Sequence, residues 1–186
     1  LSTSESMKAL FIGRFQPFHN GHLEAVRSML KQCGHVIVLV GSSQFCYEKT
    51  NPFTVGERIE MISESLREAG LWDKCQVLSV PDIQNNALWV AHVNSVVPDY
   101  EIVYSNNALT YRLFKEAGKK VEHIPFHDRS NCDGTKIRRA MQQGSAWEKF
   151  VPKAAAAVIK RVKGPERMKE VGNGDKFGDD AEEPGA

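Results

Sequence analysis

The segment from Gly13 to His22 joins two kinds of hydrophobic pattern, and this limits the folds open to the chain. Before it, the short apolar run 9–12 is typical of a buried strand. After it, apolar side chains recur at helical spacing, at Leu23, Val26 and Met29. The segment therefore predicts a strand, a glycine-bounded turn, and a helix whose first turn carries His19 and His22.

Three side chains of this segment can bind an anion together. The start of a helix exposes free backbone N–H groups and the positive end of the helix dipole, both of which favour a group such as phosphate. His19 and His22 occupy neighbouring positions on one helical face. Arg14 adds a positive charge at the carboxyl end of the strand. Together they predict a phosphate site.

Each histidine taken singly has a plainer explanation, because a histidine near a helix start usually lies on the surface or caps the helix. A zinc site is a second alternative, but His19 and His22 would need a further ligand. No Cys or His nearby in the sequence supplies one. We therefore predict no protein-bound metal and favour the phosphate site.

Predicted strands and helices alternate along the chain. The β-branched run 35–40 shows no polar alternation, which is typical of a parallel strand buried on both faces. Further strands are predicted at 76–80, 101–105 and 120–126, and helices at 54–69, 87–97, 108–117, 135–143, 146–150 and 152–162. This order predicts an α/β protein with a doubly wound parallel sheet of about five strands and helices on both faces.

A polar stretch follows each predicted strand. The stretches are 14–22, 41–51, 82–86, 105–107 and 127–134. In sheets of this class ligands bind outside the carboxyl ends of the strands, where the strand order reverses. We expect the five stretches to converge on one site.

A second anion-binding element is predicted near the end of the last polar stretch. Gly134 and Thr135 begin a helix, so their N–H groups are free for a phosphate, and the Thr135 hydroxyl adds a donor. Arg138 follows on the same side of that helix and can bind a polyphosphate through both arms of its guanidinium. The alternative for Arg138 is a solvated helix face.

Length and composition indicate one domain and exclude several classes of protein. A chain of 186 residues is long enough for one α/β domain, and its net charge of +1 predicts no general attraction to nucleic acid or membrane. No apolar run approaches the roughly 20 residues of a membrane span. The four cysteines show no C-x-x-C spacing, which favours reduced thiols in a cytoplasmic protein.

We predict a flexible leader at 1–6, a domain at 7–165 and a disordered acidic tail at 166–186.

Four motifs occur in a recognisable order. They are the segment from Gly13 to His22 with its H-x-G-H ending, N-P-F-T-x-G-E-R from Asn51, D-I-x-x-N-A-L-W from Asp82, and G-T-x-I-R-R from Gly134. With these motifs the chain resembles the archaeal type of nicotinamide-mononucleotide adenylyltransferase, within the nucleotidylyltransferase superfamily. The resemblance covers residues 7 to 165 and implies a Rossmann-like fold.

The resemblance implies a reaction and its partners. ATP and nicotinamide mononucleotide would give NAD and pyrophosphate by direct in-line transfer, with Mg²⁺ offsetting the charge of the leaving group. Such a reaction needs alignment of two anions rather than a strong base. The resemblance also implies a homo-oligomer in the cytoplasm, with no nucleic acid or membrane partner.

The motifs also imply the residues of the site. The catalytic residues would be His19, His22, Arg14 and Arg138, with further ATP contacts from Gly13, Phe15, Gly21, Gly134 and Thr135. The nicotinamide nucleotide would lie against Asp82, Ile83, Asn86 and Trp89, since an indole offers a flat face to a pyridinium ring. For Trp89 alone, a place in the core is the plainer explanation.

Two positions depart from the family pattern, and a third has an open role. Thr50 stands where relatives often carry an arginine, and the adjacent Lys49 is a candidate phosphate contact in its place. Asp133 replaces the usual serine and can cap the helix or approach the metal, but it cannot donate a hydrogen bond while ionised. Arg58 either braces the site or another chain, or lies on a solvated helix face.

Two other functions stay open. The first is nucleotidyl transfer to another phosphorylated acceptor, such as flavin mononucleotide, against which Asn86 and Trp89 argue. The second is a nucleotide-binding regulator without turnover, against which the complete set of Arg14, His19, His22 and Arg138 argues. A nucleic-acid role, by analogy with aminoacyl-tRNA synthetases that carry a related H-x-G-H, finds no basic patch here.

Overall fold

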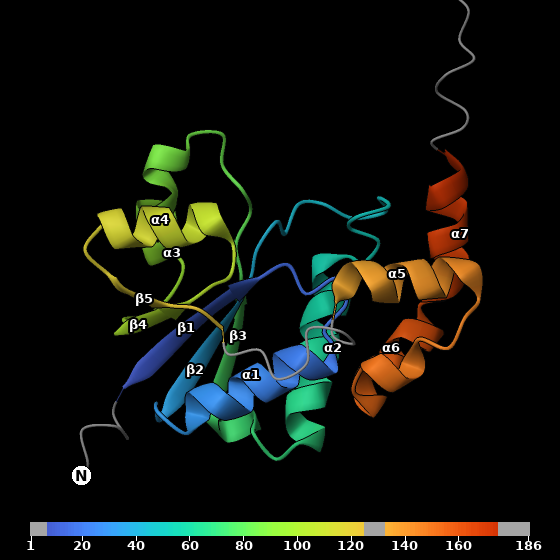
Figure 1. Ribbon diagram of the computed structural model, residues 1–186, viewed down its shortest axis with the longest axis horizontal. Helices are drawn as coiled ribbons and strands as arrows, with labels where there is room; N and C mark the ends of the chain where they lie inside the picture. Colours follow the sequence, from blue (N-terminus) through green and yellow to red (C-terminus); the bar gives the residue numbers. More distant parts are fainter. Residues whose placement is uncertain (1–6, 125–132, 175–186) are drawn as a thin grey trace, which may run out of the picture.

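A computed structural model describes residues 7–124 and 133–174 of the chain. At its centre lies a five-stranded sheet with the strand order β3-β2-β1-β4-β5, in which every neighbouring pair is parallel (Figure 1). The strands are β1 (Lys8–Gly13), β2 (His35–Val40), β3 (Cys75–Ser79), β4 (Ile102–Tyr104) and β5 (Lys120–Glu122). The predicted doubly wound sheet is confirmed. Of the strand predicted at 120–126, β5 ends at Glu122, where its pairing with β4 stops, and residues 125 and 126 lie outside the described residues.

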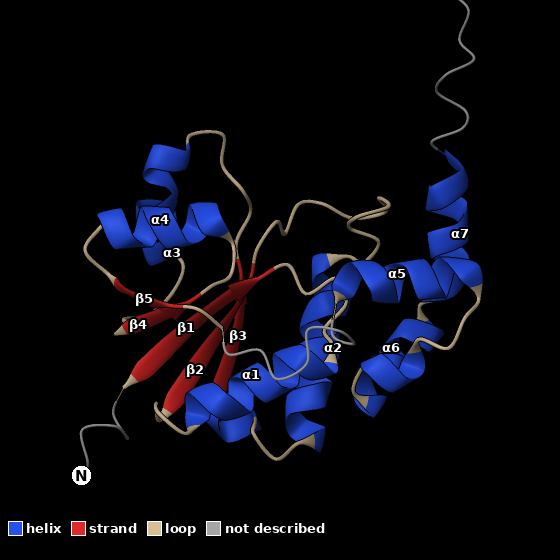
Figure 2. Ribbon diagram, in the orientation of Figure 1, coloured by secondary structure: helices blue, strands red, loops and turns tan. Residues whose placement is uncertain are grey.

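Helices cover both faces of the sheet (Figure 2). One face carries α3 (Trp89–Asn94) and α4 (Ala108–Glu116). The other carries α1 (Asn20–Leu30) and α2 (Val55–Glu68), beyond which pack α5 (Gly134–Gln143), α6 (Lys153–Arg161) and α7 (Gly164–Gly174). Three 3₁₀ turns complete the described elements: η1 (Trp72–Lys74), η2 (Asn86–Leu88) and η3 (Glu148–Phe150). The helix predicted at 146–150 is therefore only the turn η3, and the one predicted at 87–97 ends at Asn94.

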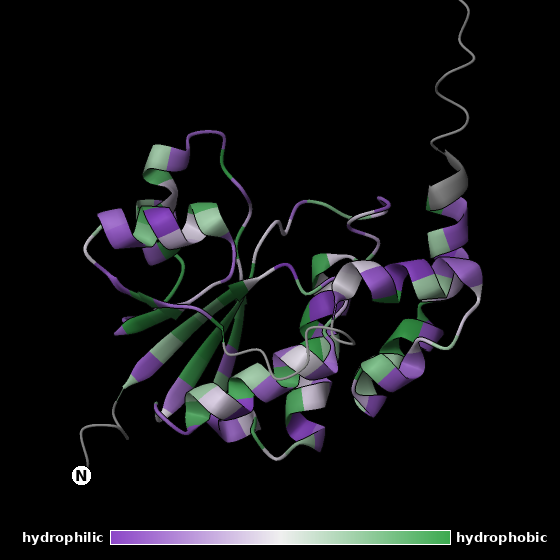
Figure 3. Cartoon of the chain, in the orientation of Figure 1, coloured by the Kyte–Doolittle hydropathy of each residue, from purple (hydrophilic) through white to green (hydrophobic). Residues whose placement is uncertain are grey.

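Burial on both faces explains the uninterrupted apolar runs of the central strands. Along β2, Val36 and Val38 enter the core under α1 and α2, whereas Ile37 and Leu39 enter the core under α3 and α4. Figure 3 shows the central strands as largely hydrophobic beyond their first residues, whereas the helices alternate hydrophobic and hydrophilic residues. The core is thus two layers separated by the sheet, and the polar functional side chains are left to the ends of the strands.

Local hydrogen bonds start and stop the helices as the residue types predict. At the start of α2 the Thr54 hydroxyl accepts from Glu57 N at 3.2 Å, and Glu57 Oε2 accepts from Thr54 N at 2.9 Å. This is the predicted capping box. Helix α5 ends at Gly144, whose φ of 68° is a left-handed conformation that glycine adopts without strain.

The predicted boundary of the tail is wrong. Residues 166–174 belong to α7, in which Met168 is only 1% exposed and Arg167 pairs with Glu57. The sequence assigned them to the tail, but packing against α5 and α6 and the pair between Arg167 and Glu57 stabilise the helix. The predicted leader 1–6 and the rest of the tail, 175–186, lie outside the described residues.

Among the described residues, Cys33, Cys46 and Cys75 are free thiols. Across 7–124 and 133–174, no helix combines the length and the apolar character needed to cross a membrane.

Candidate functional site

A pocket of about 850 Å³ opens at the carboxyl ends of the strands. Its lining includes a residue that follows each of the five strands: Arg14, Gly41, Asp82, Ser105 and Ile124. The chain winds outward from β1 in both directions, to β2 on one side and to β4 on the other, so the pocket lies over the point where the strand order reverses. The predicted convergence of the polar stretches is confirmed for their described part.

His19 and His22 form the start of α1 and both line the pocket. His19 is the N-cap, with extended backbone angles. Its Nδ1 accepts from His22 N at 3.3 Å, and His22 Nδ1 accepts from His19 N at 3.2 Å. The two rings stack with centroids 3.5 Å apart. This is a capping box in which two histidines replace the usual Ser or Thr and Glu.

The capping hydrogen bonds determine which nitrogen of each neutral ring carries the hydrogen. A neutral ring whose Nδ1 accepts a hydrogen bond carries its hydrogen on Nε2. Burial lowers the pKa of His19 to about 4. Burial, and then the neighbouring His19, lowers the pKa of His22 well below its ordinary value. Both imidazoles are therefore neutral Nε2–H donors near pH 7, rather than cations.

The aromatic rings of Phe15 and Phe18 pack against His22. The Phe15 ring meets the His22 ring edge-on at 4.9 Å, and the Phe18 ring stacks on it at 5.5 Å. Phe15 itself has a φ of 52°, and its ring passes so close to Gly13 that a Cβ there would lie 2.9 Å from it. Phe15 was predicted to contact ATP, but its side chain is only 2% exposed and does not line the pocket.

Arg58 braces the loops that follow β1 and β2. Its side chain is fully buried. Nη1 donates to the carbonyl oxygens of Arg14 at 3.0 Å and Gly41 at 2.9 Å, and Nη2 donates to that of Ser42 at 3.1 Å. The alternative of a solvated helix position is therefore wrong. A guanidinium suits this place because its fork reaches several fixed acceptors at once.

Arg138 lies beside the pocket rather than in its lining. Nη1 donates to the Gln16 carbonyl oxygen at 2.8 Å, and Nη2 donates to the Thr135 hydroxyl at 3.2 Å. The solvated helix face is thus excluded for Arg138, which is partly buried, while Thr135 is exposed and also outside the lining. Each Nη atom keeps one hydrogen for a ligand.

Asp133 caps α5, as one of its two predicted roles required. Its Oδ1 accepts from Thr135 N at 2.8 Å, and its residue lines the pocket together with Gly134. The starts of α1 and α5 therefore both border the pocket. Lys49, the candidate substitute for an arginine, lies on the exposed loop after β2 and is absent from the lining.

The four residues predicted for the nicotinamide nucleotide all line the pocket. Asp82 and Ile83 follow β3, Asn86 is exposed at the start of η2, and Trp89 is 9% exposed at the start of α3. Trp89 thus belongs both to the core and to the pocket wall.

One wall of the pocket lies outside the four motifs. This wall is formed by residues after β4, on α4 and after β5: Ser105, Asn106, Asn107, Leu109, Thr110, Leu113 and Ile124. The position of 105–107 directly after a predicted strand does indicate a place at the site. Nothing in the spacing of Leu109 and Leu113 distinguishes a pocket wall from an ordinary helix face.

Across the described residues, no three His, Cys, Asp or Glu side chains gather as a possible metal site. The pocket lining contains two carboxylates, Asp82 and Asp133. Either carboxylate could contact a Mg²⁺ ion that arrives with a nucleotide, because Mg²⁺ usually keeps water and phosphate oxygens as most of its ligands.

Comparison with known proteins agrees with this geometry. A family profile described as cytidylyltransferase-like matches residues 10–140. The nicotinamide-nucleotide adenylyltransferase of Archaeoglobus fulgidus is 45% identical over 173 residues, which cover 91% of this chain and 99% of that protein. The enzyme of the same name from Pyrococcus horikoshii is 42% identical over 163 residues, which cover 88% of each chain.

A solved structure supports the fold. The crystal structure of a bifunctional NMN adenylyltransferase/ADP ribose pyrophosphatase from Francisella tularensis matches with a TM-score of 0.74 at 19% identity. The match covers 92% of this chain and 54% of that one, so this chain spans about half the length of the bifunctional protein. At this level of identity the likeness concerns the fold alone.

Proposed function

The chain belongs to the cytidylyltransferase-like family, and we propose that it is a nicotinamide-nucleotide adenylyltransferase that makes NAD and pyrophosphate from ATP and nicotinamide mononucleotide. The observation that carries this proposal is the meeting of two sets of side chains in one pocket. Arg14, His19 and His22 lie at the helix start that suits phosphates, and Asn86 and Trp89 lie on the wall that suits a nicotinamide ring.

The proposed reaction is a single displacement at phosphorus. An oxygen of the mononucleotide's 5′-phosphate forms a bond to the α-phosphorus of ATP, the bond from that phosphorus to the β-bridging oxygen breaks, and pyrophosphate leaves with the electron pair. The attacking phosphate is already anionic near neutral pH, so no general base is needed. The protein has to align two anions and stabilise the charge that spreads over the reacting phosphoryl group.

The side chains around the pocket fit these tasks. The Nε2–H groups of His19 and His22 would donate to oxygens of the reacting phosphate without adding full charges. Arg14, exposed at the end of β1, would bridge phosphates of the two substrates. Arg138 and Thr135 would bind the β- and γ-phosphates with the donors that their contacts in the structure leave over.

Mg²⁺ would enter with ATP and offset the charge of the departing pyrophosphate. Asp133 is the carboxylate nearest in sequence to the helix start that would receive the β- and γ-phosphates, and its Oδ1 already accepts from Thr135 N. Its other oxygen remains able to contact the metal, directly or through water.

The nicotinamide mononucleotide would occupy the part of the pocket bordered by Asp82, Ile83, Asn86 and Trp89. The Trp89 indole would offer its face to the pyridinium ring, and the exposed Asn86 amide would pair with the carboxamide. Lys49, on the exposed loop, would reach a phosphate only if that loop moves toward the pocket.

The direct test is pyrophosphate release with ATP and Mg²⁺, with nicotinamide mononucleotide, its acid analogue and flavin mononucleotide offered in parallel. Turnover on the nicotinamide substrate is expected, and His22→Ala should reduce kcat by roughly 10²-fold or more, as the loss of a transition-state donor does elsewhere. Turnover on flavin mononucleotide alone would overturn the assignment of Asn86 and Trp89. ATP binding without turnover on any acceptor would identify a regulator instead.

We also propose a homo-oligomer in the cytoplasm, because the archaeal type that the motifs resemble is usually of this kind. Light scattering of the purified protein measures the oligomeric state, and a mass of one chain would contradict it.

A further inference from the structure

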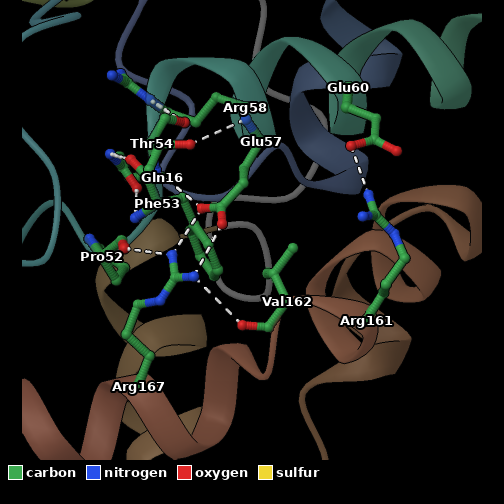
Figure 4. A network of polar contacts seen from close by, with 10 residues as sticks. All are labelled: Gln16, Pro52, Phe53, Thr54, Glu57, Arg58, Glu60, Arg161, Val162 and Arg167. Carbon is green, nitrogen blue, oxygen red and sulfur yellow. Dashed lines mark hydrogen bonds and ion pairs between the residues drawn. The ribbon is translucent and has the colours of Figure 1, made fainter.

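An ion pair joins helix α7 to α2, and the proposed function assigns no role to either of its residues. Nη1 of Arg167 donates to Glu57 Oε2 at 2.6 Å, and Nη2 donates to Glu57 Oε1 at 2.8 Å (Figure 4). The two side chains are only 11% and 16% exposed. A bidentate ion pair that is this well buried has a fixed geometry, unlike a typical ion pair on the surface.

The same guanidinium also holds backbone groups next to the start of α2. Nη1 donates to the Pro52 carbonyl oxygen at 3.0 Å, and Glu57 Oε2 accepts in turn from Thr54 N. Burial by itself raises the pKa of Glu57, but the hydrogen bonds from Arg167 and Thr54 outweigh it and hold that pKa below its ordinary value. The pair is therefore ionised near neutral pH, and it fixes the segment 52–54 from the side of α7.

Gln16 fixes the same segment from the side of the pocket. Its Nε2 donates to the Phe53 carbonyl oxygen at 2.9 Å, and its Oε1 accepts from Phe53 N at 3.0 Å. Gln16 is 4% exposed, so this pairing is shielded from water. The carbonyl oxygen of Gln16 then accepts from Arg138 Nη1 at 2.8 Å. The path from α7 to Arg138 thus consists of these hydrogen bonds, joined by the covalent backbone between Pro52 and Phe53 and by Gln16 itself.

We propose that Arg167 is a positioning residue for Arg138. By fixing segment 52–54 it fixes Gln16, whose carbonyl oxygen sets the direction of the guanidinium that would bind the β- and γ-phosphates. This inference rests on the proposed function for the role of Arg138. Small displacements of a group that aligns reactants have large effects on rate, so loss of Arg167 is expected to reach the chemistry from outside the pocket.

Three variants isolate this effect. Arg167→Gln removes the ion pair, and Glu57→Gln removes its charge while keeping a residue that completes a capping box. Arg161→Gln is the matched control, because Arg161 joins α6 to Glu60 of the same helix α2 at 2.5 Å, but on an exposed surface away from segment 52–54 (Figure 4). We expect kcat to fall about tenfold in the first two variants, with KM for the mononucleotide within about twofold of the parent.

The control Arg161→Gln should leave both constants unchanged, and Arg167→Lys, which restores the charge without the fork, should recover part of kcat. Thermal melts show whether each variant is folded. If Arg167→Gln does not fold, Glu57→Gln and Arg167→Lys carry the same test. Parental kcat in folded Arg167→Gln would overturn the proposal.

A double-mutant cycle separates positioning from general stabilisation. If Arg167 acts through Arg138, Arg167→Gln added to Arg138→Gln should lower kcat by less than about twofold further. A full tenfold loss in both backgrounds would mean that α7 supports the whole domain, and would overturn the role proposed for Arg167.

The parent protein is assayed first, so that failure of the proposed function is recognised separately. If the parent makes no NAD, the same cycle is measured with the Kd of ATP by calorimetry. Arg167→Gln should then weaken ATP binding in the parent background and leave it unchanged in Arg138→Gln. Equal ATP affinity of the parent and Arg167→Gln would overturn the inference independently of the reaction.

Discussion

At the scale of single residues, the histidine pair shows how one structural constraint sets chemical behaviour. Each Nδ1 is committed to the backbone of the other histidine, which leaves Nε2–H toward a ligand. Burial keeps both rings uncharged, so two of them can stack 3.5 Å apart without repulsion. The positive charge of the site comes instead from the guanidinium groups of Arg14 and Arg138.

The depressed pKa of His19 makes stability depend on pH in a defined direction. In the unfolded chain His19 takes up a proton as the pH falls below about 6.5, whereas in the folded protein it does so only near its pKa of about 4. The unfolded state therefore binds more protons between these values, and the free energy of unfolding should fall as the pH falls through this window. At the low-pH end of this window, the protonation of His19 in the unfolded chain should have lowered the free energy of unfolding by on the order of 3 kcal/mol.

Urea denaturation at pH 7.5, 6 and 5 measures this effect. His19→Asn keeps a good N-cap and removes the titrating ring, so its stability should depend less on pH than that of the parent. His123→Asn, which removes an exposed histidine, is the control and should follow the parent. The same pH dependence in His19→Asn and the parent would contradict the assignment.

At the scale of elements, the start of α5 combines a cap with a charge. Asp133 accepts from Thr135 N and so stabilises the helix, but its carboxylate borders the pocket that would receive a polyphosphate. The serine usual in the family caps a helix about as well without the negative charge. We therefore expect Asp133 to affect ligand binding more than the fold.

Asp133→Ser should show this separation. Its free energy of unfolding should stay within about 0.5 kcal/mol of the parent, whereas Asp133→Ala, without a cap, should lose about 1 kcal/mol. Without divalent metal, Asp133→Ser should bind ATP roughly threefold to tenfold more tightly, because one repelling charge is gone. With Mg²⁺ the gain should shrink, since the carboxylate then faces a cation. Calorimetric titrations that show no change in either condition would contradict this account.

At the scale of the whole molecule, the pocket collects residues from every strand end. Loops after β1 and β2 are tied together by Arg58, and α5 is tied to the loop after β1 by Arg138. A ligand that spans these parts should therefore stabilise the complete fold and not one segment.

ATP should accordingly raise the melting temperature of the protein. At 100 times its Kd, a ligand that binds only the folded state adds about 2.7 kcal/mol, which for a chain of this size corresponds to roughly 5–10 °C. Arg14→Ala should reduce the shift at the same ATP concentration, whereas Arg161→Gln should show the full shift. Differential scanning fluorimetry measures it, and an equal shift in Arg14→Ala would contradict a phosphate role for Arg14.

The sequence by itself determined the features that depend on neighbours along the chain. Apolar runs and helical periodicity located all five strands and every α-helix up to α6, and the Thr54–Glu57 capping box lay within one turn of helix. The motifs placed Arg14, His19, His22, Asp82, Ile83, Asn86 and Trp89 at one pocket. Each of these patterns is local, so a short window of residues contains the information that specifies it.

Only the tertiary structure decided which distant groups meet. Phe15 is buried against His22. Arg58 is buried and holds two loops together. Residues of α4 form part of the pocket wall. Gln16 pairs with a residue 37 positions away, and Glu57 with one 110 positions away. Contacts of this kind depend on the order of strands in the sheet and on how helices pack over it. No spacing along the chain encodes them, which is why the sequence predicts a tail at residues 166–174, whereas the structure places them in α7 and pairs Arg167 with Glu57.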